Sequence, residues 1–175
     1  MSKINTIDID LDGVMTDYDS NMIRLTGFTV SELMGMDIKD RVSIKNQAKD
    51  KGLFSTMKLL PGAADAFYTL ISQYESKGYT LRILTATGEY ESERSAKEKI
   101  AWVRGNLCTE CEVICVTHAR DKLEYAGPNS ILIDDYETTC AMFDEGEGSA
   151  IQHEEWPTTL NHLEHAIGFN GEFNV

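Results

Sequence analysis

The stretch from Ile4 to Asp17, INTIDIDLDGVMTD, constrains the fold more than any other part of this sequence. An apolar run carries two aspartates, Asp10 and Asp12, to its end, and Gly13 follows, where the backbone must turn tightly. A strand that ends in carboxylates and breaks at glycine places charge at the rim of a sheet, where α/β proteins hold their sites. Two carboxylates one residue apart repel each other unless a cation or a proton offsets them. The alternative is a solvated strand end whose acidic residues belong to a loop.

Short apolar runs alternate with helical patterns along the rest of the chain. Strands are expected at 79–85, 112–116, 130–133 and 149–152. Helices are expected after Pro61-Gly62, over 89–107, over 137–145 and after Pro157, with a short helix or turn at 119–127. This alternation implies right-handed crossovers and a mainly parallel sheet. The predicted fold class is therefore α/β, with a Rossmann-like parallel sheet of about five strands flanked by helices.

The helix predicted over 89–107 is highly charged and has one apolar stripe. That stripe consists of Ala96, Ile100, Val103 and Leu107. Residues at this spacing share one side of a helix, so we expect them to face the core. Trp102 lies on the same helix and is interpreted as a packing residue.

Residues 17–60 differ in character from the alternating pattern. Thr29-Val-Ser-Glu32 reads as a capping box, and the stretch DIKDRVSIKNQAKDKG has helical spacing that Gly52 stops. We interpret 17–60 as a small helical cap inserted after the first strand, and residues 1–16 and 61–175 as the core domain. A lid over the end of the first strand is the favoured role, and a long helical crossover is the alternative.

The size and charge of the chain limit its function. Its 175 residues suit one domain with a small insertion, and the net charge of −13 argues against extended nucleic-acid binding and against an anionic membrane surface. An acidic enzyme with an anionic substrate needs a bound cation and a few local Lys or Arg. No apolar run approaches the length of a membrane span, and the N-terminal residues lack a signal-peptide pattern. A cytoplasmic location is the expectation.

Three of the four cysteines cluster in the sequence CTECEVIC, at Cys108, Cys111 and Cys115. The C-x-x-C spacing suggests zinc or a redox pair, with His118 close by. Cys115 lies inside an apolar strand, however, and the chain has no second C-x-x-C. Ordinary reduced thiols are therefore the favoured interpretation.

Parallel strands end at one edge of a sheet, so residues far apart in the sequence are expected to meet there. The expected group is Asp10, Asp12, Thr85, Asp134 and Asp135, with Lys122 on the segment before the fourth strand. These parts suit phosphoryl transfer. One carboxylate can attack phosphorus, and a second can exchange a proton with the leaving oxygen and then with water. Mg²⁺ is typically held by a few carboxylates and the substrate phosphate, while a lysine and a hydroxyl orient the phosphoryl oxygens.

The same residues carry a resemblance to a known family. Asp10-Leu-Asp12-Gly-Val14, the strand-terminal Thr85, Lys122 and the sequence ILIDD ending at Asp135 resemble the four motifs of the haloacid dehalogenase (HAD) superfamily. More narrowly, the chain is similar to the 5'(3')-deoxyribonucleotidases and their phage-type relatives. The supporting segments are DLDGVMTDY, GLFSTMKLLPGA, EKIAWV and ARDKLEYAGPNSILIDD, which run in order through about residues 4–165.

The resemblance implies roles for the carboxylates and predicts Mg²⁺ as the cofactor. Asp10 would be the nucleophile and would also contribute to the metal site. Asp12 would be the general acid and base, and its backbone carbonyl would bind Mg²⁺. Asp135 would hold the metal directly or through water, with Asp134 beside it as a ligand or a supporting carboxylate.

The resemblance also implies residues that bind phosphate. Thr85 would bind it with help from the backbone at Ala86, and Lys122 would bridge the phosphate and the nucleophile. Lys99, in EKIAWV, matches a lysine that reaches the phosphate, although it could equally be a surface residue of a charged helix. Thr87 is an alternative source of the hydroxyl.

Two further residues match substrate-binding positions of the family. Arg120 would lie near the substrate, and Tyr18 would lie against the base or the sugar. Arg120 could instead be a surface charge at the start of a helix, and Tyr18 could pack under the insertion. His118 is interpreted as a loop histidine.

The function that the resemblance implies is Mg²⁺-dependent hydrolysis of (deoxy)nucleoside monophosphates through an aspartyl-phosphate. The short insertion has no tryptophan, so base selectivity does not transfer, and Thr85-Ala-Thr-Gly replaces the family's usual Ser-Pro-containing loop. A sugar phosphate or a nucleic-acid end phosphate is the alternative substrate, and a non-enzymatic phospho-acceptor is the alternative class. The expected partner is a small nucleotide, with no extended nucleic acid and no membrane, and a homodimer is left open.

Overall fold

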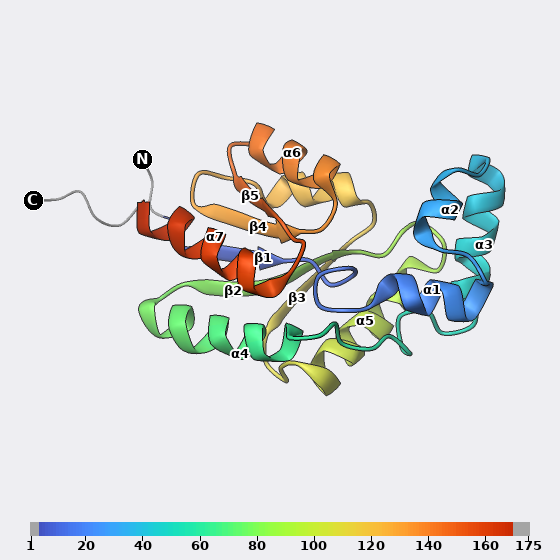
Figure 1. Ribbon diagram of the computed structural model, residues 1–175, viewed down its shortest axis with the longest axis horizontal. Helices are drawn as coiled ribbons and strands as arrows, with labels where there is room; N and C mark the ends of the chain where they lie inside the picture. Colours follow the sequence, from blue (N-terminus) through green and yellow to red (C-terminus); the bar gives the residue numbers. More distant parts are fainter. Residues whose placement is uncertain (1–3, 170–175) are drawn as a thin grey trace, which may run out of the picture.

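Five parallel strands form the central sheet of the computed structural model, which describes residues 4–169 (Figure 1). The strands are β1 (Thr6–Ile9), β2 (Thr80–Ala86), β3 (Glu112–Val116), β4 (Ser130–Asp134) and β5 (Ser149–Gln152). Their order is β3-β2-β1-β4-β5, so β1 lies in the middle between β2 and β4. The predicted α/β fold class with a five-stranded parallel sheet is confirmed.

The central strand β1 is buried on both faces, as expected for a parallel sheet that helices cover on both sides. Ile7 and Ile9 are fully buried on one face, and Asp8 between them is fully buried on the other. Asp8 accepts two hydrogen bonds from the guanidinium of Arg82 on β2, at 2.7 and 2.9 Å. Since Asp8 and Arg82 are also register partners, this ion pair ties β1 to β2 at one alignment.

Helices cover both faces of the sheet. One face carries α4 (Ala63–Tyr74), α5 (Ser92–Asn106) and α7 (Trp156–Phe169), and the short 3₁₀ helix η1 (Glu75–Lys77) extends α4 (Figure 1). The other face carries α6 (Glu137–Glu145) and the 3₁₀ helix η2 (Ala119–Tyr125). These elements lie where the sequence predicted them. No helix in the described part of the chain is both long and apolar enough to cross a membrane.

The apolar stripe predicted for α5 is partly wrong. Ala96 and Ile100 stay partly exposed, whereas Lys99 and Trp102 are buried. The Trp102 indole donates a hydrogen bond to the carbonyl oxygen of Met57 at 2.8 Å, so Trp102 is a packing residue as predicted. Hydrophobic periodicity assigns lysines to the surface, and it therefore misses a helix that turns a lysine inward toward a carboxylate.

Three helices form a cap beyond the carboxyl ends of the strands (Figure 1). They are α1 (Tyr18–Thr26), α2 (Val30–Met34) and α3 (Ile38–Asp50). The predicted capping box opens α2, where the Thr29 side chain accepts from the backbone of Glu32 and the Glu32 carboxylate accepts from the backbone of Thr29. A helical cap after the first strand is thus confirmed, while the exact domain boundaries at residues 17 and 60 remain predictions.

The cap is joined to the core by two segments that run side by side. The backbone N–H of Asp17 donates to the carbonyl of Lys58, and that of Leu60 donates to the carbonyl of Met15, both at 2.9 Å. Apolar cap residues, including Leu33, belong to the same buried cluster as the core. This double connection holds the cap over the carboxyl edge of the sheet.

Candidate active site

Three aspartates from two neighbouring strands meet at the carboxyl edge of the sheet. Asp10 follows β1, and its backbone N–H continues the sheet by donating to Ile133 of β4 at 2.9 Å. Asp134 ends β4 and Asp135 follows it, and one carboxylate oxygen from each of the three aspartates lies within 4.8 Å of the others. Carboxylate oxygens are the donors that hard divalent cations such as Mg²⁺ prefer. The three aspartates could therefore hold a metal ion.

Gly13 allows the carboxylate of Asp135 to approach the turn that follows β1. Its φ of +78° lies in the left-handed region, and a side chain there would collide with the carboxylate of Asp135. The tight turn expected after the two aspartates is confirmed. The glycine has a second role that the sequence did not reveal, because it leaves room for a carboxylate from another strand.

Lys122 supplies positive charge beneath the aspartates. Its side chain is almost fully buried, and its Nζ lies 2.9 Å from Oδ1 of Asp10 and 2.6 Å from Oδ2 of Asp134. Burial opposes the charge, but these two carboxylates outweigh it and raise the pKa of Lys122 above its ordinary value. Lys122 therefore stays charged and fixes Asp10 and Asp134 relative to each other.

Lys99 forms an ion pair with Asp12, as Lys122 does with Asp10 and Asp134. Its fully buried Nζ donates to Oδ2 of Asp12 at 2.7 Å and to the hydroxyl of Thr85 at 2.8 Å. Burial raises the pKa of Asp12 above its ordinary value, while the charge of Lys99 opposes this increase and that of Asp10 adds to it. A carboxyl with a raised pKa, held at one oxygen, is suited to exchanging a proton through the other.

Two carboxylate oxygens of the site lack hydrogen-bond partners among the described residues. They are Oδ1 of Asp10 and Oδ1 of Asp12, and both are buried. The first lies 2.9 Å from Lys122 Nζ, which is an ion-pair distance without hydrogen-bond geometry. Desolvation and the charges of Asp10 and Asp134 also raise the pKa of Asp135 to about 7. A divalent cation bound among the aspartates would relieve this repulsion.

The site opens into two adjoining cavities between the core and the cap. One has a volume of about 540 Å³ and contains the aspartates and Lys122 in its wall, and the other, of about 730 Å³, lies between α3 and the loop after β2. The residues that line both are Asp12, Tyr18, Lys45 and Ala86. The two cavities therefore meet beside the carboxylate of Asp12.

The structure brings most of the predicted residues to this site. Tyr18 lines both cavities, and burial together with the charge of Asp12 raises the pKa of its hydroxyl. Ala86 also lines both. Thr85 and Lys99 lie outside the lining of either cavity, and Lys99 links the two residues by donating to both Asp12 and Thr85.

Arg120 is not brought to the site. Its side chain is 73% exposed, it is absent from the walls of both cavities, and its guanidinium lies 3.8 Å from the carboxylate of Asp121. The substrate role that the resemblance implied for Arg120 has no support in this placement. η2 buries Lys122 at the fourth position of its sequence, and this leaves Arg120 on the outer side.

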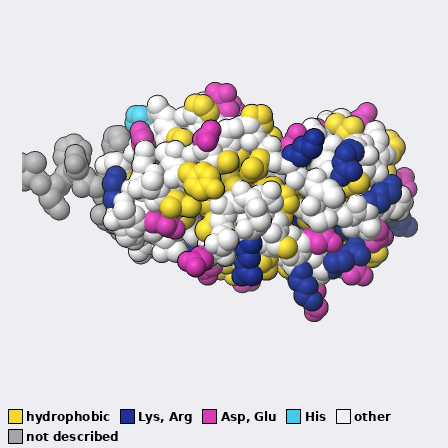
Figure 2. Space-filling model, turned by 90° about the horizontal axis from the view of Figure 1, so that it is seen from below, with side chains coloured by type: hydrophobic (Ala, Val, Ile, Leu, Met, Phe, Trp, Pro, Cys, Tyr) yellow, Lys and Arg dark blue, Asp and Glu magenta, His cyan; other side chains and the backbone are white. Residues whose placement is uncertain are grey.

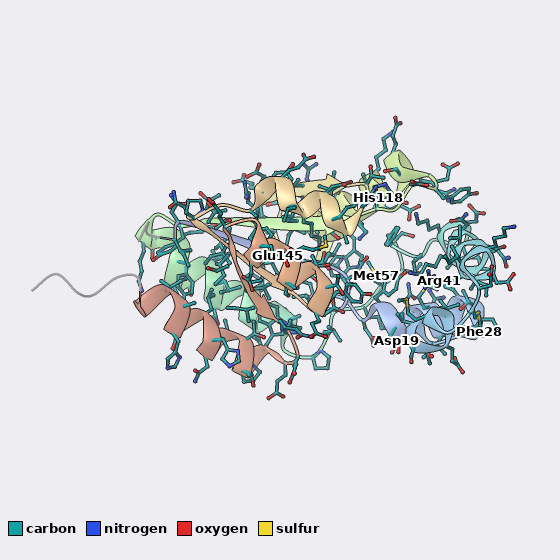
Figure 3. The ribbon with its side chains drawn as sticks, turned by 90° about the horizontal axis from the view of Figure 1, so that it is seen from above. Asp19, Phe28, Arg41, Met57, His118 and Glu145 are labelled. Carbon is teal, nitrogen blue, oxygen red and sulfur yellow. The ribbon has the colours of Figure 1, made fainter. Side chains whose placement is uncertain are left out.

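Three cations of the cap were missed by the sequence analysis. Arg41, Lys45 and Lys49 of α3 line the cavities, and their spacing of four residues places them on one side of the helix. The four-residue spacing of these cations is the sequence signal that could have revealed them. Figure 3 shows Arg41 on the cap side of the site and His118 on the core side.

The cysteines are free of disulfides within the described residues and do not join the group of aspartates. The backbone N–H of Cys111 donates to Sγ of Cys108 at 2.9 Å. Burial and the contact with Cys108 raise the pKa of Cys111 to about 12, so this thiol is protonated at neutral pH. That protonation favours the interpretation as ordinary thiols over a reactive thiolate.

No protein-family model matches this sequence, and no curated protein matches it. Solved structures match it in fold. A haloacid dehalogenase-like hydrolase from Streptococcus pneumoniae aligns with a TM-score of 0.64 and 18% identity, over 97% of this chain and 100% of its own.

Two further structures match with ligands bound. CbbY from Rhodobacter sphaeroides, in complex with phosphate, has a TM-score of 0.55 and 16% identity over 87% of this chain and 90% of its own. A HAD family enzyme from Bacteroides thetaiotaomicron, in complex with magnesium and inorganic phosphate, has a TM-score of 0.51 and 14% identity over 89% of this chain and 98% of its own. The chain therefore has the fold of the haloacid dehalogenase-like hydrolases, as its motifs predicted.

Proposed function

We propose that this protein is a Mg²⁺-dependent phosphomonoesterase that acts through an aspartyl-phosphate on Asp10. The observation that carries the proposal is the environment of Asp10. Its carboxylate is held by Lys122, it keeps a buried oxygen without a hydrogen bond, and it lies beside two more aspartates at the wall of a cavity. A nucleophilic carboxylate needs this combination of fixed position, free lone pairs and nearby positive charge.

The residues present fit Mg²⁺ as a cofactor. Asp10, Asp134 and Asp135 supply hard oxygen donors, and the two phosphate-bound structures of similar fold, one of which also contains magnesium, support the assignment. Bound Mg²⁺ would neutralise the phosphoryl oxygens and bring the phosphorus next to Asp10.

The reaction would proceed in two displacements. An oxygen of Asp10 attacks phosphorus, the bond from phosphorus to the leaving oxygen breaks, and Asp12 gives its proton to that oxygen. Asp12 then removes a proton from water, the water oxygen attacks phosphorus, and the bond to Asp10 breaks to release inorganic phosphate. The raised pKa of Asp12 favours the protonated form that the first step requires, and Lys99 orients its carboxyl group.

The substrate we propose is a (deoxy)nucleoside monophosphate. The cavity of about 730 Å³ has aromatic rings in its wall, including Tyr18, Phe54 and Tyr90, and it adjoins the aspartates. Aromatic faces of this kind pack against nucleobases. The sequence similarity of the segments around Asp10, Lys99 and Lys122 to deoxyribonucleotidases supports the same class.

Phosphate release from a panel of phosphomonoesters, with and without Mg²⁺, tests the proposal. We expect Mg²⁺-dependent release, fastest with nucleoside monophosphates. Asp10→Asn should lower kcat by more than about 10,000-fold because the amide is a poor nucleophile. Asp65→Asn makes the same chemical change on the exposed side of α4 and should leave kcat unchanged.

Three outcomes would contradict the proposal in different ways. Full activity of Asp10→Asn would remove the aspartyl-phosphate mechanism. Hydrolysis of sugar phosphates as fast as that of nucleotides would leave the mechanism standing and remove the nucleotide assignment. A stable acyl-phosphate without release of inorganic phosphate would indicate a phospho-acceptor instead of an enzyme.

A further inference from the structure

The face of α3 that looks onto the site is cationic, although the chain as a whole carries a net charge of −13. Arg41, Lys45 and Lys49 occupy this face at intervals of four residues. Arg41 and Lys45 line the cavity of the aspartates, while Lys45 and Lys49 line the adjoining one. Figure 2 shows that Lys and Arg side chains also gather at the cap end of the molecule on the face it draws.

The three cations differ in their hydrogen-bond and ion-pair partners. Lys49 is buried, and its Nζ donates to the carbonyl oxygens of Thr87 at 2.7 Å and Tyr90 at 2.8 Å. The Arg41 guanidinium donates to the sulfur of Met34 at 3.3 Å and makes no ion pair with a described residue. Lys49 therefore serves the structure, whereas Arg41 lacks an anionic partner.

Of the three cations, Lys45 has the fewest hydrogen-bond and ion-pair partners. It is partly buried, and within residues 4–169 its ammonium makes neither a hydrogen bond nor an ion pair. Burial and the charge of Arg41 lower its pKa, and the charge of Asp12 only partly offsets this decrease. A lysine held beside another cation without a counter-ion destabilises the free protein, and an anion bound between Lys45 and Arg41 would remove that cost.

Three carboxylates of the core are paired with core lysines, so Arg41 and Lys45 are available to bind another anionic group. Lys122 is paired with Asp10 and Asp134, and Lys99 is paired with Asp12, so the core lysines are already engaged at the site of reaction. A leaving group that extends from Asp10 toward the cap would meet Arg41 and Lys45 at the opposite wall of the same cavity.

From this arrangement we propose that Arg41 and Lys45 form a subsite for a second anionic group on the leaving-group side of the substrate. The substrate would then be a phosphomonoester that carries a second phosphate or a carboxylate, such as a nucleoside bisphosphate. This inference rests on the proposed function, and it narrows the substrate from phosphomonoesters in general to those with a second anionic group.

Matched substrate pairs test the subsite. Adenosine 3',5'-bisphosphate is compared with adenosine 5'-monophosphate, and 6-phosphogluconate with glucose 6-phosphate. We expect the doubly anionic member of at least one pair to have a kcat/KM about 10- to 100-fold higher. Lys45→Met should abolish this preference, mainly by raising KM, and Lys45→Arg should retain it. Lys97→Met, on the exposed side of α5, should change nothing.

Two outcomes with Lys45→Met would overturn the subsite proposal. An equal loss with both members of each pair in Lys45→Met would mean that Lys45 acts on the reacting phosphoryl group, and the subsite proposal would be overturned. An unchanged preference would overturn it as well.

Binding to the Asp10→Asn variant separates this inference from the proposed function. Calorimetry with adenosine 3',5'-bisphosphate and adenosine 5'-monophosphate needs no turnover, so it reports on the subsite even without hydrolysis. Tighter binding of the bisphosphate that is lost with Lys45→Met would support the subsite alone. Equal binding of the two nucleotides would overturn it even where the wild-type protein releases phosphate.

Discussion

The two sides of the candidate active-site cavity are built on different principles. On the core side, four carboxylates meet two buried lysines, and most of their charges are paired within the protein at 2.6 to 2.9 Å. On the cap side, α3 presents cations, and Arg41 and Lys45 find no carboxylate within ion-pair distance among the described residues.

Under the proposed function, this difference would separate chemistry from recognition. Groups that are paired and buried hold their geometry without substrate, as the reacting centre of a phosphatase requires. Unpaired cations in a cavity gain most when an anion arrives, as substrate binding requires. We therefore expect changes on the core side to lower kcat and stability, and changes on the cap side to raise KM.

Among the changes that compare the two sides of the cavity, Lys122→Met is expected to have the largest effect. This change leaves Asp10 and Asp134 buried without their shared cation, so we expect a loss of unfolding free energy of about 3 kcal/mol. We also expect a fall in kcat of about 100- to 1,000-fold. Urea unfolding measures the change in unfolding free energy, and steady-state kinetics measures the change in kcat.

Lys122→Arg keeps the charge and serves as the matched variant for this test. Unchanged stability of Lys122→Met would show that the core site is not preorganised by its ion pairs. The contrast with the cap side would then lose its basis.

An intermediate effect is expected for Lys49→Met, which breaks the tie between α3 and the loop after β2. The carbonyls of Thr87 and Tyr90 would lose their ammonium donor, so α3 should open more readily. Amide hydrogen exchange should become faster over 38–50 and stay unchanged over 63–74. We expect KM to rise about threefold to tenfold with little change in kcat.

Lys51→Met is the matched control for Lys49→Met. It removes an exposed lysine next to the same helix end, whose ammonium donates to the carbonyl of Leu25 within the cap. Faster exchange over 63–74 in Lys49→Met would indicate global destabilisation instead of a loosened cap.

The smallest effect is expected for Arg120→Ala. The side chain is mostly exposed and lies outside both cavities, so kcat and KM should stay within about twofold of the wild type. Steady-state kinetics with the preferred substrate gives the answer. A tenfold rise in KM would place Arg120 at the substrate after all, and the boundary of the recognition side would then include η2.

Much of the fold followed from local patterns. The strand after Ile4, the capping box at Thr29 and the helix after Gly62 each depend on residues that are near one another in the sequence. The grouping of Asp10 with Asp134 followed from topology, because parallel strands share a carboxyl edge. The part of the site carried by the strands could therefore be predicted.

The sequence left open which basic side chains point toward the site, and the physical reason is the same for each. Whether a lysine points inward depends on a carboxylate that comes from another element. Lys99 is paired with Asp12 across 87 positions of sequence, so the hydrophobic pattern of α5 does not reveal its burial, and only the family resemblance of EKIAWV pointed to the site. Arg120 and Lys122 lie two residues apart on η2, and only the placement of this segment against β4 decided which of them reaches Asp10.

The stretch from Ile4 to Asp17 thus determined by itself a buried strand, two carboxylates at its end and a tight turn at Gly13. Hydrophobicity and backbone conformation are properties of the local chain, and this is why the sequence was sufficient for them. Only the tertiary structure decided which charge each aspartate meets, with Lys122 beside Asp10, Lys99 beside Asp12 and the carboxylate of Asp135 against Gly13. Electrostatic interactions depend on distance in space, and the fold alone sets those distances.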